Sequence, residues 1–181
     1  PDVLSEDKRR NPYRKVQYGS YKIFVDGSLG ARSAALFEPY NDAPDTKGLF
    51  VIGQQELNET TYRTYVDCMK PAIHCIGDAG ADAVIQAIEY TLRRCKEEGM
   101  TQADIDARPP FRLIHAQLLN DDVLNRMKNL PLIFDLQPVS MCTVMHWIEQ
   151  RVGAKRSRYA HMIKTLSDMG FILTGSSDAP V

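Results

Sequence analysis

Five short segments of the chain are rich in apolar and β-branched residues, and each is bounded by glycine, proline or polar turn residues. This pattern is typical of buried strands, because strand residues pack into a sheet and turn formers end them. The first segment, YKIFVDG, stops at Asp26-Gly27, and the second, PAIHCIG, stops at a histidine and a glycine turn. The predicted strands are 21–27, 71–77, 111–117, 130–138 and 171–178.

Helical periodicity lies between these predicted strands. The clearest helix is 79–98, where apolar residues recur at helical spacing and Gly99 provides a stop. Helices are also predicted at 55–69 and at 120–129, the latter capped by Asn120 or Asp121, and 144–170 is partly helical. The periodic residues of the clearest helix are Val84, Ile85, Ile88, Leu92 and Cys95.

Strands that alternate with helices predict right-handed βαβ units and a parallel sheet, which is an α/β fold. The segment 28–53 interrupts this alternation, because it is rich in turn formers, shows little periodicity and is longer than a simple connection. No repeat or low-complexity linker divides the chain. We therefore predict that residues 1–181 belong to a single domain with an insertion at about 28–53.

One polar residue accompanies each predicted strand, namely Lys22, His74, His115, Gln137 and Asp178. Their spacing fits the units of about 30 residues in a (β/α)8 barrel, with moderate insertions. In such a barrel the carboxyl ends of all strands face one shared mouth. Two imidazoles and a carboxylate at that mouth are suitable ligands for zinc or a similar divalent ion.

Each of these residues also has an ordinary structural interpretation. A single histidine at a strand end is more often hydrogen-bonded within the structure than bound to a metal. Asp178 before Ala-Pro is also good turn chemistry, and Lys22 is most simply a solvated flank. His146 and His161 lie in the helical region, so no role is assigned to them.

The charge balance narrows the classes of partner. Lys plus Arg number 22 and Asp plus Glu number 23, so the chain has no excess charge for nucleic acid or for an anionic membrane surface. No apolar run approaches the roughly 20 residues of a membrane helix, and residues 1–20 are not built like a signal peptide. The four cysteines are scattered without a C-x-x-C pair. We expect a cytoplasmic protein with a small-molecule substrate; self-association into a homo-oligomer is left open.

Five blocks of sequence carry a resemblance to a known family. They are KIFVDGSLGARSAAL, AIHCIGDAGAD, RLIHAQ, QPVS and GSSDAPV, and they occur in this order between about residues 21 and 181. Together they resemble the amidohydrolase superfamily, specifically the amidohydrolase-3 group of YtcJ-like metal-dependent hydrolases. The resemblance implies a metal-dependent (β/α)8 barrel.

The resemblance also implies roles for particular residues. The histidines of barrel strands five and six, which bind metal in the family, fall on His74 and His115. The strand-eight aspartate, a metal ligand and proton shuttle, falls on Asp178. The strand-four lysine, carboxylated in many two-metal members, falls on Lys22, and an ammonium group must be desolvated before its amine can capture carbon dioxide. The implied cofactor is one or two divalent ions, with zinc the first choice.

One family element has no counterpart in this sequence. The superfamily places a His-x-His at the end of barrel strand one, and no His-x-His occurs here. The chain therefore resembles only strands four to eight of the barrel. We expect it to be a C-terminal portion of a longer enzyme and expect the isolated segment to be inactive.

The expected reaction is hydrolysis of a carbon–nitrogen bond in a non-peptide amide, formamide or cyclic amide, with metal-activated water. Asp178 is the expected general base and acid, and Gln117 and Asp78 are candidates for orienting the metal ligands. Arg32, Gln117 and Gln137 are candidates for substrate binding, although Arg32 is slightly better explained as a loop cap. Two alternatives stay open: a deaminase of a heterocyclic amine on the same barrel, and a non-catalytic barrel that has lost part of its metal site.

Overall fold

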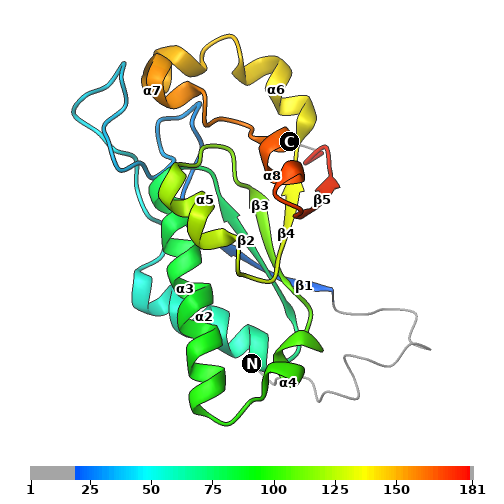
Figure 1. Ribbon diagram of the computed structural model, residues 1–181. Coiled ribbons are helices and arrows are strands. Elements are labelled where there is room, and N and C mark those ends of the chain that lie inside the picture. The colour runs from blue at the N-terminus through cyan, green and yellow to red at the C-terminus, as the bar shows by residue number, and fades with distance from the viewer. Residues whose placement is uncertain (1–18, 180–181) are drawn as a thin grey trace.

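The computed structural model describes residues 19–179, which form one parallel sheet with helices between its strands (Figure 1). The five strands lie side by side in the order in which they occur along the chain, and every neighbouring pair is parallel. Their carboxyl ends therefore lie along the same edge of the sheet. This arrangement confirms the predicted α/β fold. The strands are β1 Ser20–Phe24, β2 Lys70–Cys75, β3 Phe111–His115, β4 Leu132–Leu136 and β5 Ile172–Gly175.

The helices connect successive strands. Figure 1 shows α2 and α3 along one side of the sheet and α6 and α7 beyond the carboxyl ends of the strands. Within the described part of the chain, no helix is long and apolar enough to span a bilayer. The helices are α2 Gln54–Val66, α3 Asp78–Glu97, α4 Gln102–Asp106, α5 Asp121–Met127, α6 Pro138–Val144, α7 Ile148–Ser157 and α8 Ile163–Asp168.

Local chemistry explains where these helices depart from the predicted ones. Helix α2 ends earlier than predicted because Cys68 adopts a positive φ of 57°, outside the right-handed helical region. Helices α4 and α6 were not predicted, since both are too short to show a clear period. Asn120 caps α5 as predicted, accepting a hydrogen bond from the Val123 amide, and the predicted segment 144–170 is broken at Gly153, whose φ is 76°.

The strand side chains alternate between a face covered by helices and an open face. On the covered face, the residues that lie opposite one another on neighbouring strands form a row of apolar side chains that are buried or partly buried. The row on the other face includes polar side chains. At its β1 end the apolar ring of Phe24 is 53% exposed, and at its β5 end the hydroxyl of Thr174 donates a hydrogen bond to Asp135. The covered row is Ile23, Ile73, Leu113, Phe134 and Leu173, and the open row is Phe24, His74, Ile114, Asp135 and Thr174.

A second, smaller core lies beyond the strand ends. Loop residues after β1, including Leu29, Leu36 and Tyr40, pack with apolar residues of α6 and α7. A backbone hydrogen bond also joins these segments: the Asn41 amide donates to the Arg151 carbonyl at 2.7 Å. The loop 28–49 is therefore fixed against α7 and forms part of the rim above the strand ends.

Gly77 allows this loop to approach the first turn of α3. A Cβ atom at position 77 would lie 1.9 Å from the Ala35 carbonyl oxygen. That oxygen cannot easily move away, because it accepts the Ala79 and Gly80 amides at 3.1 and 3.3 Å. The loop therefore contacts the α3 N-terminus through a position that only glycine can fill.

We expect Gly77→Ala to lower the free energy of unfolding by at least about 2 kcal/mol relative to a matched control, because the clash is with backbone. The control is Gly53→Ala at the N-cap of α2, which has a similar extended conformation and no atom within 4 Å of the added Cβ. Both variants lose the same N-cap preference. Urea unfolding of the full-length protein measures the difference, and equal stability of the two variants would contradict the close approach.

Candidate active site

His74 and His115 lie next to each other at the carboxyl ends of β2 and β3. Their ring centroids are 4.6 Å apart, and the rings meet edge to face. His74 is largely buried and His115 is half-buried. The structure thus brings together the two histidines that the sequence analysis assigned to metal binding.

The ring of His74 is oriented by the end of β1. Its Nε2 lies 3.1 Å from the Gly27 carbonyl oxygen and 3.5 Å from Asp26 Oδ1. A carbonyl and a carboxylate accept hydrogen bonds, so in the neutral ring the proton lies on Nε2. Nδ1 then carries the free lone pair and is the nitrogen available to a ligand.

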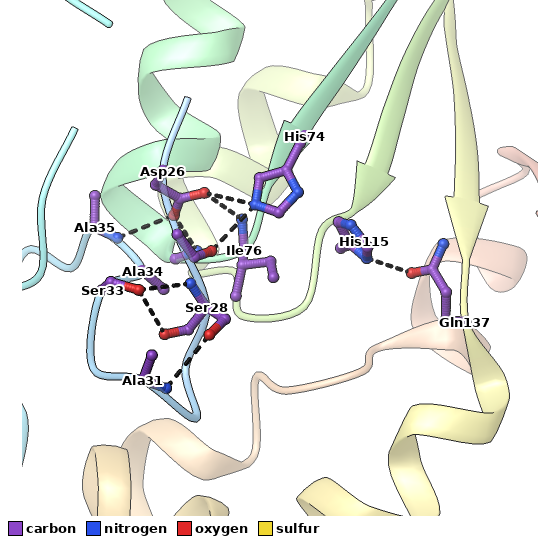
Figure 2. Close-up of polar contacts among 12 residues, drawn as sticks. Asp26, Ser28, Ala31, Ser33, Ala34, Ala35, His74, Ile76, His115 and Gln137 are labelled. Carbon is purple, nitrogen blue, oxygen red and sulfur yellow. Dashed lines mark hydrogen bonds and ion pairs between the residues drawn. The ribbon is translucent and has the colours of Figure 1, made fainter. Parts of the chain in front are cut away.

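Asp26 is held so firmly that it can position another side chain. It is 2% exposed, and it accepts the amides of Ala35, Ile76 and Gly77 at 2.9, 3.0 and 2.8 Å. Burial raises the pKa of Asp26, while the amide bonds and His74 act to lower it. Figure 2 shows this carboxylate beside His74, joining the loop after β1 to the β2–α3 turn.

His115 is oriented in the corresponding way by Gln137, the residue that follows β4 and caps α6. Its Nδ1 lies 2.7 Å from Gln137 Oε1. Figure 2 draws this contact as a dashed line. The Gln137 amide nitrogen donates to the Asp135 carbonyl and to Ser176 Oγ, both at 2.9 Å, so its oxygen must face the histidine. Nδ1 of His115 therefore carries the proton and Nε2 the free lone pair.

Burial is the largest cause that lowers the pKa of His115, to about 4, and the neighbouring His74 adds to it. The ring is therefore neutral at pH 7. Neutral imidazole is the form that binds metals, and a second hydrogen bond that fixes the ring is the usual arrangement around a metal-binding histidine.

A cavity of about 350 Å³ opens beside His115, and Asp178 lines it together with Gln117 and Gln137. Asp178 is exposed and its φ is 59°. Its negative charge acts to raise the pKa of His115 and of Lys22. Within residues 19–179, no three His, Cys, Asp or Glu side chains form a cluster that could hold an ion; Asp178 and His115 line the same cavity.

Backbone strain marks the same cavity. Positive φ angles occur at six non-glycine residues of the described chain, and three of them, His115, His161 and Asp178, line this cavity. Such conformations cost about 1–3 kcal/mol each and gather at functional sites. The strain is an independent reason to consider this cavity functional.

Lys22 lies on the open face of β1, with its ammonium 4.8 Å from the centre of the Phe24 ring. Loss of water around the amine lowers the pKa of Lys22, while Asp178 and Asp135 oppose that effect. A lowered pKa increases the neutral form that carboxylation requires. Its role as a carboxylated ligand stays a prediction.

Two of the three candidate substrate-binding residues line the cavity, and the third does not. Arg32 forms two hydrogen bonds to Asp42, at 3.1 and 2.9 Å, and does not line the cavity. Gln117 does line it, and its amide nitrogen lies 2.9 Å from His161 Nε2. Gln137 lines it while holding His115. Their contacts with substrate stay predictions.

Asp78, considered in sequence as a residue that orients the ligands, instead fixes the loop after β1. Its Oδ1 accepts the Phe37 amide at 3.2 Å and the Ala79 amide at 3.0 Å. The groups that do orient the histidines are the Gly27 carbonyl and the Asp26 carboxylate for His74 and the Gln137 amide for His115. Sequence reasoning did not assign Asp26, because Asp26-Gly27 after a strand is also an ordinary turn signal.

These features define a site with two histidines at the carboxyl ends of the strands of a parallel sheet, of the kind found in metal-dependent hydrolases. The profile of the amidohydrolase family matches residues 3–181, so the chain belongs to that family. Its sheet corresponds to part of the metal-dependent hydrolase barrel, as predicted. The family implies a divalent metal, and two imidazoles that each keep one nitrogen free of the hydrogen bonds described above fit one.

Individual relatives support this assignment. YtcJ of Bacillus subtilis (strain 168) is 35% identical over 175 residues, which cover 97% of this chain and 30% of that protein. The crystal structure of an uncharacterized metal-dependent hydrolase from Pyrococcus furiosus matches with a TM-score of 0.77 and 35% identity, over 92% of this chain and 32% of that one. The crystal structure of a second uncharacterized metal-dependent hydrolase, from Pyrococcus horikoshii OT3, matches with a TM-score of 0.75 and 33% identity, over 92% of this chain and 31% of that one. The chain spans about a third of the length of these relatives.

We expect Asp26→Asn to weaken divalent-metal affinity of the full-length protein by roughly 10- to 100-fold, because it removes the carboxylate that lies 3.5 Å from His74 Nε2 and helps the Gly27 carbonyl to fix that ring. Both carboxylate oxygens accept backbone amides, so an amide NH₂ cannot replace them. Competition with a chromophoric chelator measures the affinity.

The control is Asp78→Asn, which alters another buried carboxylate at the same end of α3 that has no contact with His74. It should cost stability while leaving metal affinity within about threefold of wild type. If both variants weakened the metal equally, Asp26 would have no specific role in positioning His74.

Proposed function

We propose that the protein containing this chain is a metal-dependent hydrolase that cleaves the carbon–nitrogen bond of a non-peptide amide, formamide or cyclic amide. The observation that carries the proposal is the His74–His115 pair, in which one nitrogen of each ring is hydrogen-bonded and the other is left for a ligand. Membership of the amidohydrolase family supports it.

The residues that would hold the ion are His74 through Nδ1 and His115 through Nε2. Zinc is the proposed ion, since two imidazoles and one carboxylate are a common set of zinc ligands. Asp178 is the proposed carboxylate, and Lys22 is the proposed further ligand if it is carboxylated. When bound, such an ion lowers the pKa of water and polarises a carbonyl group.

The chain itself supplies proton transfer and orientation. Asp178 is placed at the wall of the cavity, where an ionised carboxylate accepts a proton from the attacking water and later returns it to the leaving nitrogen. Gln137 keeps His115 in one tautomer, and the Gly27 carbonyl, with Asp26 beside it, does the same for His74. The ligands are therefore pre-oriented before substrate enters, which lowers the cost of reaching the transition state.

We expect His74→Ala in the full-length protein to lose bound metal and turnover together, because it removes one of the two histidine ligands. The matched control is His146→Ala, which changes an exposed histidine in the connection between α6 and α7. Elemental analysis and initial rates on a panel of formamides, cyclic amides and simple amides provide the two readouts. Full metal content and unchanged rate in His74→Ala would contradict the proposal.

Asp178→Asn should behave differently from the histidine variant. We expect it to lower kcat by about 10²- to 10⁴-fold, the usual contribution of a general acid–base group, while most of the metal is retained on the histidines. Steady-state kinetics with metal-saturated protein measures this change. A variant with wild-type kcat would show that another group transfers the proton.

A further inference from the structure

The cavity beside His115 has a second wall that takes no part in metal binding or proton transfer. Leu29, Ile76 and Val144 are buried with their side chains at this wall, and Trp147 is half-buried there. These residues come from the loop after β1, the end of β2, the last turn of α6 and the start of α7. The wall is thus assembled from segments that the second core holds together.

Trp147 is fixed in place before any ligand arrives. A Cβ atom at Gly30 would lie 4.0 Å from Cη2 and Cζ2 of the indole, so the ring edge rests on the glycine backbone. The guanidinium carbon of Arg151 lies 5.5 Å from the ring centre, within the range of a cation–π contact. Arg151 is itself ion-paired with Asp42. A rigid aromatic wall costs little entropy when a ligand binds.

The arginine side chains nearest this wall are already paired with a carboxylate. Asp42 binds both Arg32 and Arg151, and Arg151 also donates to the Gly30 carbonyl at 3.3 Å. Among the described residues that line the cavity there is no lysine or arginine. Asp178 is therefore the charged side chain of this lining, and an anionic substituent placed against Leu29, Val144 and Trp147 would lose its water without meeting a lysine or arginine of the lining.

The remaining polar groups of the cavity are uncharged. Burial lowers the pKa of His161, so its ring is neutral at pH 7. The Gln117 amide, which lies 2.9 Å from His161 Nε2, donates to it and leaves the proton on Nδ1. Both side chains line the cavity, as do His115 and Asp178. Such groups orient a neutral polar ligand but do not compensate a charge.

We infer that the space between Asp178 and Trp147 is a subsite for an uncharged apolar group, an aromatic ring or a branched alkyl chain, attached next to the scissile carbon–nitrogen bond. This inference rests on the proposed function and specifies its substrate class. A volume of about 350 Å³ is large enough for one ring. Leu29, Val144 and Trp147 would contact the apolar group, and His115 of the proposed metal-binding pair lines the same cavity.

The test compares formanilide, formamide and N-formylglycine as substrates of the full-length protein, with Trp147→Ala and Trp147→Phe as variants. We expect wild type to prefer formanilide to N-formylglycine. Trp147→Ala should lower kcat/KM for formanilide by about tenfold or more, and for formamide by less than about twofold. Trp147→Phe, which keeps an aromatic wall and the fold, should retain most of the formanilide activity.

The matched control is Phe37→Ala, which deletes an exposed aromatic side chain of the neighbouring loop that does not line the cavity. It should leave all three substrates unchanged. An equal loss for formanilide and formamide in Trp147→Ala would overturn the subsite, as would a wild-type preference for N-formylglycine.

A binding experiment separates failure of the subsite from failure of the proposed reaction. Formanilide titrated into the full-length wild type should quench the part of the tryptophan fluorescence that Trp147→Phe removes, and Trp147 is the one tryptophan of residues 1–181. If no amide is hydrolysed but this quenching saturates, the subsite stands and the proposed reaction is wrong. If hydrolysis occurs without saturable quenching, the subsite is wrong.

Discussion

The buried carboxylate of Asp26 is the interaction on which the arrangement of the site depends. One side chain accepts amides from the loop after β1 and from the β2–α3 turn, and it lies beside the ring of His74. A buried carboxylate is costly unless its oxygens are fully hydrogen-bonded. The same bonds that offset that cost therefore fix the loop, the start of α3 and the orientation of a metal-binding histidine in a single unit.

The parallel sheet supplies the second constraint. Because all strands run the same way, residues at their carboxyl ends gather at one edge even though they are distant in sequence. His74 and His115 need only occupy the ends of adjacent strands to meet with their rings 4.6 Å apart. The loop 28–49 and helices α6 and α7 then close over that edge and give the cavity its apolar wall.

Local patterns in the sequence predicted much of this fold, since an apolar run ending in His or Gly is a short-range signal. The strands, α2 and α3 were placed from such signals, and so were the two histidines. The ring nitrogens available for binding could not be predicted this way, because they depend on Gly27 and Gln137, which lie far from the histidines in sequence. Trp147 was likewise not assigned, since its position above Gly30 follows from contacts between distant segments.

The central claim is that His74 and His115 bind one ion through their unpaired nitrogens. The most direct measurement is anomalous diffraction from crystals of the metal-loaded full-length protein, collected on both sides of the zinc absorption edge. The account predicts an anomalous peak at about 2.0–2.1 Å from both Nδ1 of His74 and Nε2 of His115. A metal bound elsewhere, or bound through Nε2 of a rotated His74 ring that has left Asp26, would contradict it.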